Sequence, residues 1–284
     1  MSTNPNIKVI GSLTARFNRD PLGLGRTSGQ RGAEIIAGIR AELMRTPETI
    51  ALSRLGGRLT ARTMMALERE DMFNYIPARF EIMTDMALKH TPFDSASTLV
   101  EIAAGFSPRA LHLARRIPEA NVLEIDLPDV IAEKRKRLEK NPQIRIPANL
   151  TWRAADLSQQ MLSEVLNHKL VDMILAEEML LYFPLEDCQH ILQQISLSLR
   201  RGAYLVTSIG FRPGIQQAHK AARFFNRQAG NFLGVVDQPE EARQLFESSG
   251  YVDVQVERIS ALATKMNLAE VPADVELMVL ARRP

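Results

Sequence analysis

Acidic side chains stand where successive apolar runs of this chain end. Asp126 follows the apolar run 122–125. Asp156 follows the next such run, and Glu177 closes the one after it. In a parallel sheet, a carboxylate at the end of a strand can accept hydrogen bonds from the hydroxyls of a ribose. The spacing therefore indicates chemistry with a nucleotide-like cofactor, held along one edge of such a sheet.

The first apolar run, 99–102, leads into a tight turn, Ala103-Ala104-Gly105, ahead of a predicted helix. A strand end of this kind can receive a nucleotide-like cofactor. Taken alone the turn is a weak signal, because dinucleotide sites usually carry three glycines and this turn has one. Asp126, about twenty residues further on, supports the interpretation of this turn as a cofactor site, because a parallel-sheet domain places the acceptor for the ribose there.

Each of these acids also has an interpretation without a ligand. Asp126 and Asp156 could cap the helices that follow them, since Asp is favoured at helix N-caps. Their recurrence at consecutive strand ends favours contact with a cofactor instead. Glu101 lies inside a predicted buried strand, where a carboxylate costs several kcal/mol unless it is hydrogen-bonded or paired.

Length and composition fit an enzyme with one large core, or one core and a subdomain. The chain has 284 residues, of which 45% are apolar, and a net charge of +2. Basic and acidic residues are interspersed, so nucleic acid is not indicated as a partner. The densest basic run, Lys134–Arg137, is flanked by acids on a predicted helix, and we interpret it as a solvated face.

The single cysteine, Cys188, excludes an internal disulfide and fits a reducing compartment. It falls on the apolar face of a predicted helix, which indicates a core thiol. No apolar run approaches the roughly 20 residues that cross a bilayer, and the N-terminus lacks the core of a signal peptide. We therefore expect a cytoplasmic protein with no membrane partner.

Helices are predicted before any strand. Residues 1–30 are rich in Gly and Pro and predict an irregular arm or loop. Helical periodicity starts at Ala33, and a further helix is predicted over 76–89. These patterns divide the chain into an N-terminal arm and helical cap, 1–92, and a sheet domain, 93–284.

Strand and helix patterns then alternate, as in a doubly wound parallel sheet. The predicted strands are 98–103, 121–126, 149–154, 171–176, 203–209, 253–259 and 275–282. A helix is predicted over 185–200, a helical insertion over 211–235 with its helix at 214–232, and a loop containing Pro272 before the last strand. This order suggests the seven-stranded sheet of S-adenosylmethionine-dependent methyltransferases, in which the last strand inserts antiparallel.

Four segments resemble the leucine carboxyl methyltransferase-like family of S-adenosylmethionine-dependent O-methyltransferases. They are Glu101–Ala110, Glu124–Ile131 with Lys134, Ala155–Leu157 and Ala176–Phe183. The first turn of that family is usually Gly-Ala-Gly followed by Asp-Thr-Arg, and this chain departs from it with Ala-Ala-Gly and Ser-Pro-Arg. The resemblance covers residues 76–210 and implies a Rossmann-like sheet with S-adenosylmethionine as cofactor.

The resemblance also assigns roles at the adenosine end of the cofactor. Asp126 would accept hydrogen bonds from the ribose hydroxyls. Asp156 and Leu157 would contact the adenine amino group and ring. Further cofactor contacts are assigned to Ala103, Gly105 and Leu127.

At the methionine end, Glu177 would lie beside the cofactor. Arg79, on the helix before the sheet, matches the family arginine that pairs with the cofactor carboxylate, a task that suits a bidentate guanidinium. The alternative interpretation of Arg79 is a surface cation on a helix. Glu101 would bond the backbone or a water molecule near the amino end of the cofactor.

No catalytic residue is assigned from the sequence. Methyl transfer is an in-line displacement, so the protein mainly has to align the reactants. A carboxylate acceptor, with a pKa of about 4, needs no base, whereas a hydroxyl does. His90 and His219 are candidate bases, although each is more often a surface or capping residue. No cluster of residues has metal-ligand spacing, so no metal is predicted.

We expect the acceptor to be a small-molecule metabolite, recognised by the N-terminal helices and the insertion. A protein C-terminus is the alternative acceptor. Two other function classes stay open, a nicotinamide-dependent oxidoreductase and a non-catalytic cofactor-binding regulator. The oligomeric state is also open, with a homodimer as one option.

Overall fold

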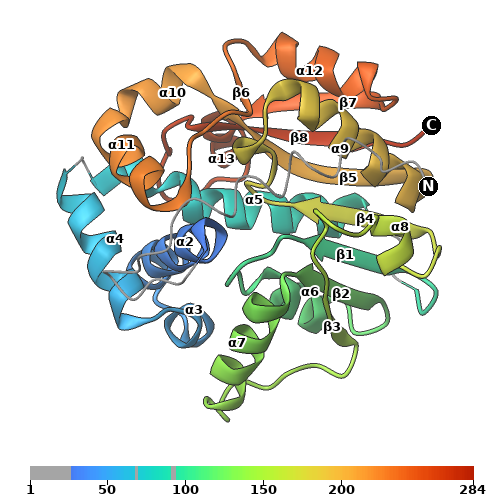
Figure 1. The fold of residues 1–284 in the computed structure, drawn as a ribbon, viewed down its shortest axis with the longest axis horizontal. Helices are drawn as coiled ribbons and strands as arrows, with labels where there is room; N and C mark the ends of the chain where they lie inside the picture. The colour runs from blue at the N-terminus through green and yellow to red at the C-terminus, as the bar shows by residue number, and fades with distance from the viewer. Residues whose placement is uncertain (1–26, 68–69, 91–93) are drawn as a thin grey trace.

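One mixed β-sheet runs through the molecule, with helices on both of its faces (Figure 1). The computed structural model describes residues 27–67, 70–90 and 94–284. The strands are β1 (Thr98–Ile102), β2 (Asn121–Asp126), β3 (Leu150–Ala154), β4 (Val171–Ala176), β5 (Leu199–Phe211), β6 (Val235–Val236), β7 (Val252–Arg258) and β8 (Glu276–Arg282). Their order is β3-β2-β1-β4-β5-β8-β7, and β6 pairs with β5.

Neighbouring strands run parallel except where β8 is involved. β8 lies between β5 and β7 and pairs antiparallel with both. The predicted doubly wound α/β sheet with an antiparallel last strand is thus confirmed. Because β1 to β5 are parallel, their carboxyl ends meet at one edge of the sheet, which is where ligands bind in such folds.

Helices cover both faces of this sheet. One face packs against α8 (Leu162–Val165), α9 (Leu185–Ser198) and α12 (Pro239–Ser248). The other packs against α5 (Tyr75–His90), α6 (Arg109–Arg116), α7 (Pro128–Glu139) and α13 (Ile259–Lys265). In β1, Leu99 joins the second cluster and Val100 the first, as the two-residue period of a strand requires. Burial on both faces explains why the strands are nearly continuous apolar runs in the sequence.

A helical cap precedes the sheet in the chain. It contains α2 (Ser28–Met44), α3 (Pro47–Leu52), α4 (Leu55–Leu67) and the 3-10 helix η1 (Glu70–Phe73). The insertion after β5 forms α10 (Arg212–Gln217) and α11 (His219–Ala229), and α11 packs against α2 and α4. Figure 1 shows these blue, cyan and orange helices gathered at one side of the sheet. Apolar side chains of cap and insertion, such as Ile35, Met64 and Phe225, share one buried cluster.

The cap is tightly joined within itself and to the sheet domain. A Cβ atom on Gly38 of α2 would overlap the carbonyl oxygen of Gly57 of α4, so these helices touch backbone to backbone. Arg137 of α7 donates to the Glu34 carboxylate and to the carbonyl oxygen of Leu52. The Arg137 contacts therefore connect α2 and α3 to a helix that packs on the sheet.

The N-terminal prediction is wrong at its boundary. α2 begins at Ser28, inside the predicted arm of residues 1–30, because Thr27 and Gln30 form a reciprocal capping box. Residues 1–26 lie outside the described part of the chain.

Two predictions near the C-terminal end also differ from the structure. The insertion holds two helices rather than one, with the break at Ala218. The predicted loop before the last strand contains helix α13, whose Ile259 and Leu262 are buried on the sheet. These buried contacts are tertiary, so the local sequence pattern gave little sign of the helix.

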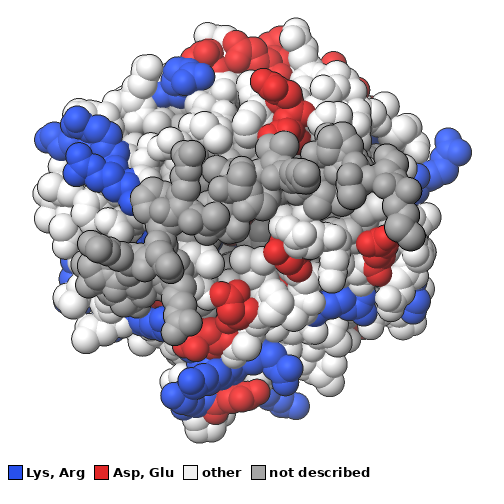
Figure 2. Space-filling model, viewed as in Figure 1, with Lys and Arg blue, Asp and Glu red and all other residues white. Residues whose placement is uncertain are grey.

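The basic run at residues 134–137 is a solvated face only in part. Lys134 is buried and its Nζ lies 2.5 Å from Glu124 Oε1 of β2. Arg137 is buried beneath the cap, whereas Arg135 and Lys136 are exposed. Residues three apart share a helix face, so Lys134 and Arg137 point inward together. At the lower end of the molecule, where Figure 1 shows α7, Figure 2 shows basic and acidic side chains next to one another.

Cys188 lies in the core, as predicted. Its thiol is fully buried and donates to the carbonyl oxygen of Leu180 at 3.4 Å. Burial raises the pKa of this thiol to about 12, so it is not a nucleophile at neutral pH. Among the described helices, none combines the length and the apolar character needed to cross a membrane.

Candidate active site

The turn after β1 lies beside the end of β2. Parallel pairing sets Ile102 opposite Ile125, so the turn begins level with Asp126. The Gly105 amide donates to Asp126 Oδ2 at 2.6 Å. Ala103 is exposed and has a φ of +52°, a conformation that non-glycine residues seldom adopt. Such strain persists where the surrounding structure holds it, and it is common at functional sites.

Asp126 is bonded to backbone rather than capping the next helix. Its Oδ1 accepts from the Leu127 amide at 2.7 Å, and Leu127 itself holds the N-cap position of α7. Burial raises the pKa of Asp126, although the amides of Gly105 and Leu127 act in the opposite direction. Each carboxylate oxygen has two acceptor positions, so one amide leaves each oxygen able to accept another donor.

Asp156 lies at the adjoining strand end. β2 pairs with β3 so that Asp126 is opposite Ala154, two residues before Asp156. Asp156 Oδ1 accepts from the Ser158 amide at 2.9 Å and from the Ser158 hydroxyl at 2.6 Å. Leu157 is half-buried and packs against the sheet core. The predicted adenosine contacts therefore occur in order along the carboxyl edge of β3, β2 and β1.

A buried group of charges, here called the Glu177 cluster, lies at the carboxyl ends of β1 and β4 and under the cap. Its members are Arg40, Arg79, Arg109, Glu101, Glu177, Glu178 and Glu276. All except Glu178 are nearly inaccessible to solvent. Buried charges of this kind are stable only when paired, so their arrangement is closely determined.

Glu177 is held by three arginines from three helices. Arg79 of α5 places Nε 2.8 Å and Nη2 2.7 Å from Glu177 Oε1. Arg109 of α6 places Nη1 2.6 Å from Oε2, and Arg40 of α2 also contacts Oε1. Burial alone would raise the pKa of Glu177, but the three guanidinium groups outweigh it and hold the pKa well below its usual range. Glu177 is therefore ionised at neutral pH.

Glu101 has a charged partner, contrary to the predicted bond with backbone or water. Arg109 Nη1 lies 2.8 Å from Glu101 Oε1. The other oxygen, Oε2, has no hydrogen-bond partner in the described part of the chain, nor do Nε and Nη2 of Arg109. These atoms are buried, so the cluster retains unused donors and an unused acceptor.

Glu276 occupies the far end of the cluster, at the start of β8. Arg79 Nη1 pairs with Glu276 Oε2, and Arg79 Nη2 lies 2.9 Å from Glu178 Oε2. Burial raises the pKa of Glu276 to about 7, although Arg79 opposes the shift. Glu178 has a φ of +54°, so the end of β4 is strained like the end of β1.

The structure thus brings the nine predicted cofactor residues to one edge. Arg79 is a buried member of the cluster rather than a surface cation. His90 instead packs its ring on Tyr204, which pairs with Arg282 at the opposite end of β8. His219 is exposed at the start of α11. Neither histidine touches the Glu177 cluster in the contacts of the described residues.

Sequence reasoning missed Arg40, Arg109 and Glu276. Glu276 carries the same signal as Glu101, an acid inside an apolar strand, and could have been found by it. Arg40 interrupts the apolar face of a predicted helix, which is a weaker signal. Arg109 belongs to the segment Glu101–Ala110 that resembles the family, but the spacing of residues in the sequence does not predict that it pairs with Glu177.

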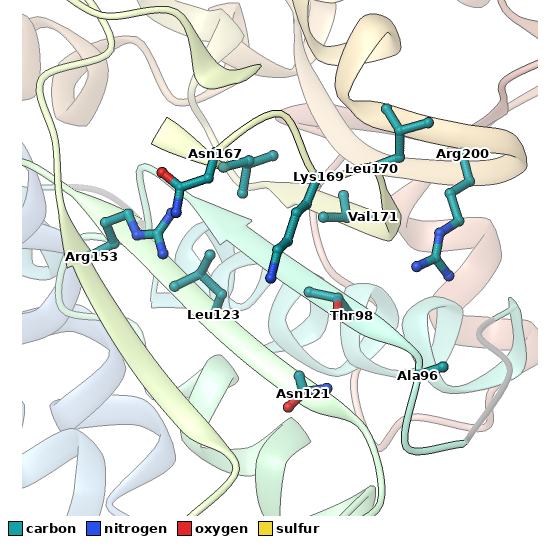
Figure 3. A pocket seen from close by; sticks show the side chains of 11 residues that line it. Ala96, Thr98, Asn121, Leu123, Arg153, Asn167, Lys169, Leu170, Val171 and Arg200 are labelled. Atoms are coloured by element: carbon teal, nitrogen blue, oxygen red, sulfur yellow. The ribbon is translucent and has the colours of Figure 1, made fainter. Parts of the chain in front are cut away.

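One surface cavity lies at the opposite edge of the sheet (Figure 3). Its volume is ≈ 480 Å³, and Thr98 and Asn121, at the beginnings of β1 and β2, line it. Arg200 at its rim is paired with Asp172 at 2.6 Å. The cavity is therefore separate from the carboxyl edge that carries the predicted residues.

Comparison with known proteins identifies the family. The model of the leucine carboxyl methyltransferase family matches residues 31–196, which is more than half of the chain. No curated protein matches the sequence.

Solved structures share the fold at low sequence identity. A DUF574 family protein from Streptomyces avermitilis has a TM-score of 0.62 at 18% identity, over 89% of this chain and 97% of that one. A proposed methyltransferase from Thermobifida fusca has a TM-score of 0.61 at 14% identity, over 88% and 94%. Human N-acetylserotonin methyltransferase, solved with its S-adenosylmethionine, has a TM-score of 0.52 at 14% identity, over 98% and 81%.

The antiparallel last strand, the acids along the carboxyl edge and the family match agree with one another. The chain therefore belongs to the leucine carboxyl methyltransferase family and is an S-adenosylmethionine-dependent methyltransferase.

Proposed function

We propose that this enzyme methylates an oxygen atom, of a carboxylate or a hydroxyl, on a small-molecule metabolite in the cytoplasm. The single buried cysteine, Cys188, fits the reducing environment of that compartment. The proposed cofactor contacts are Arg79, Glu101, Ala103, Gly105, Asp126, Leu127, Asp156, Leu157 and Glu177, with Arg40 and Arg109 added from the geometry.

The adenosine half of S-adenosylmethionine fits the ends of β3, β2 and β1. The unused acceptor positions of Asp126 suit the two ribose hydroxyls. Asp156 and Leu157 at the next strand end offer an acceptor and an apolar side chain for the adenine. The exposed, strained backbone at Ala103 allows close approach of the ligand to the turn.

The methionine half fits the Glu177 cluster by charge. With all groups ionised, three arginines against four glutamates leave one net negative charge. S-adenosylmethionine carries an ammonium, a sulfonium and a carboxylate, and so has one net positive charge. The unpartnered buried atoms of Glu101 and Arg109 match an ammonium donor and a carboxylate acceptor, respectively.

The cofactor supplies an activated methyl group, so the protein has to bind and align. A near-linear arrangement of acceptor oxygen, methyl carbon and sulfur is the main requirement. Glu177, which is ionised at neutral pH, would stabilise the sulfonium. Arg79 and Arg40, together with the unpartnered nitrogens of Arg109, would fix the carboxylate. The cap and insertion would exclude water from the reacting groups.

Aromatic side chains near the cluster favour a small acceptor. Tyr182 lies on the 3-10 helix η2 (Leu180–Tyr182), and its ring is 6.4 Å from that of Phe232 in the insertion. The Phe225 ring is 5.5 Å from the Phe232 ring. We propose that the cap, predicted as residues 1–92, and the insertion, 211–235, together form the acceptor pocket. Methylation of a protein C-terminus is the second candidate, and only the family name favours it.

The main support for the proposal is the order of polar groups along one edge of the sheet, from Asp156 to Glu177. Calorimetry with S-adenosylmethionine, its demethylated product and nicotinamide cofactors tests it. We expect micromolar or tighter binding of the first two and none of the nicotinamide cofactors. Failure of both to bind a folded sample would contradict the proposed site.

A further inference from the structure

The order of strands separates two parts of the carboxyl edge. In the proposed function, the cofactor lies across the ends of β3, β2, β1 and β4. The next positions along the edge belong to β5 and β8. Glu276 begins β8 and pairs with Gly210 near the end of β5. Glu276 therefore lies on the side of Glu177 that faces away from the adenosine, where the acceptor must approach.

One guanidinium joins the two sides. Arg79 contacts Glu177 on the cofactor side and both Glu178 and Glu276 on the acceptor side. A carboxylate acceptor would add a further anion next to Glu178 and Glu276. Among the described residues, the one cation paired with both is Arg79, which is already shared with Glu177. A neutral hydroxyl group carries no such penalty.

Glu276 also has a free acceptor atom. Its Oε1 is buried and has no partner of good hydrogen-bond geometry in the described part of the chain, although the Ser208 hydroxyl is close enough to lower the pKa of the carboxyl. An unsatisfied buried carboxylate oxygen is costly, and a hydroxyl donor from a substrate would satisfy it. Burial raises the pKa of the phenols of Tyr75 and Tyr182 well above the usual value, so neither phenol is a base at neutral pH.

We propose that the acceptor group is a hydroxyl and that Glu276 is the base that takes its proton. This inference rests on the proposed function. The acceptor oxygen forms a bond to the methyl carbon while the carbon–sulfur bond breaks, and the electron pair of that bond stays on sulfur. The hydroxyl proton passes to Glu276 Oε1, and the products are a methyl ether, the neutral thioether and a protonated Glu276.

The electrostatics of the cluster agree with this role. Burial raises the pKa of Glu276 to about 7, which is near the optimum for a base that works at neutral pH. Glu177, held by three arginines, has its pKa depressed and is too weak a base. The charged and titratable groups that face Glu276 are Arg79 and Tyr75 from α5, Glu177 and Glu178 after β4, and Tyr182 from η2.

The chemistry of the product tests the inference. Purified enzyme is incubated with methyl-labelled S-adenosylmethionine and the small-molecule fraction of a cell extract, and the labelled product is treated with mild alkali. A methyl ether survives alkali, whereas a methyl ester releases volatile methanol. We expect a base-stable product. A base-labile product overturns the hydroxyl inference and leaves the proposed function intact, and no labelled product contradicts the proposed function itself.

Variants at Glu276 separate catalysis from folding. Glu276→Gln keeps the size of the side chain and an acceptor for Arg79, so cofactor affinity measured by calorimetry should change little. The amide cannot take the hydroxyl proton, so methyl transfer should fall at least 100-fold. Glu276→Asp should retain part of the activity. Glu247→Gln, at an exposed position of α12, is the matched control and should behave as wild type.

The dependence on pH gives a second readout. The wild-type rate should rise with pH through about 7, and the rise should be missing in Glu276→Gln. Undiminished transfer by Glu276→Gln, with the same pH profile, overturns the role of Glu276.

Discussion

Two nitrogens of Arg79 contact the same oxygen of Glu177: Nε lies 2.8 Å and Nη2 2.7 Å from Oε1. Both side chains are buried, so this contact orients Arg79 firmly. The remaining nitrogen, Nη1, is then directed to Glu276. The position of Glu276 in the cluster thus depends on a pair formed at the end of another strand.

Removing the Glu177 charge should destabilise the fold. Glu177→Gln leaves Arg40, Arg79 and Arg109 buried with one anion fewer, and breaking a buried charge pair typically costs about 3 to 5 kcal/mol. Urea unfolding at pH 7.5 measures the loss. Glu257→Gln, which removes a surface partner of Lys265, should cost much less. Equal losses for the two variants would show that the cluster does not depend on Glu177.

Asp126→Ala should weaken S-adenosylmethionine binding by about 1.5 to 3 kcal/mol, the range for a hydrogen bond to a charged group. The alanine variant also loses the acceptor of the Gly105 and Leu127 amides, so its melting temperature should fall. Asp126→Asn keeps one acceptor and should lose affinity with a smaller loss of stability. Calorimetry and thermal unfolding of both variants separate the two effects. Unchanged affinity per folded molecule would mean that Asp126 only supports the turn.

Gly105→Val should abolish cofactor binding. Gly105 has a φ of +53°, and a Cβ atom there would lie 3.2 Å from Ala33 Cβ of α2. Gly202→Val is the matched control, because Gly202 has a φ of +80° but no atom within 4 Å of an added Cβ. Both variants bear about 1 to 2 kcal/mol of backbone strain, but only Gly105→Val also brings the turn into close contact with α2. Calorimetry that shows binding by both variants would contradict the position of the cofactor.

Stability should depend on Glu276 between pH 5 and pH 8. The carboxyl has a pKa of about 7 when folded against an ordinary value of 4.5, so the folded state keeps a proton that the unfolded state releases. This contribution to the free energy of unfolding is complete below pH 4.5, the pKa in the unfolded state. It is lost as the pH rises through about 7, the pKa in the folded state, by about 3 kcal/mol at most. Urea unfolding of wild type and Glu276→Gln at several pH values isolates this group. If the free energy of unfolding changed with pH equally in wild type and Glu276→Gln, the raised pKa of Glu276 would be contradicted.

The positions of the residues that we propose for the adenosine could be predicted because their signals are local. Asp126, Asp156 and Gly105 follow directly from strand ends and a turn, and parallel pairing alone brings them to one edge. The strands could be placed for the same reason, since burial on both faces makes each of them an apolar run.

The Glu177 cluster, which we propose for the methionine end of the cofactor, could be predicted only in part, because it depends on long-range partners. Glu101 and Glu177 were placed correctly at this edge, but the approach of Arg40 and Arg109 to them is set by how α2 and α6 pack. A long, flexible arginine can reach several acids, so spacing in the sequence does not select among them. Helix α13 was missed for a related reason, since its stability comes from burial on the sheet.

The backbone contact between Gly38 and Gly57 has a mechanical consequence. Two helices in such close contact cannot slide past one another without separating first, and protein interiors yield little to compression. We therefore expect α2 and α4 to move together as one body. Any opening of the cap that admits substrate would be a hinge rotation of this pair, with the bending confined to the segments at its ends.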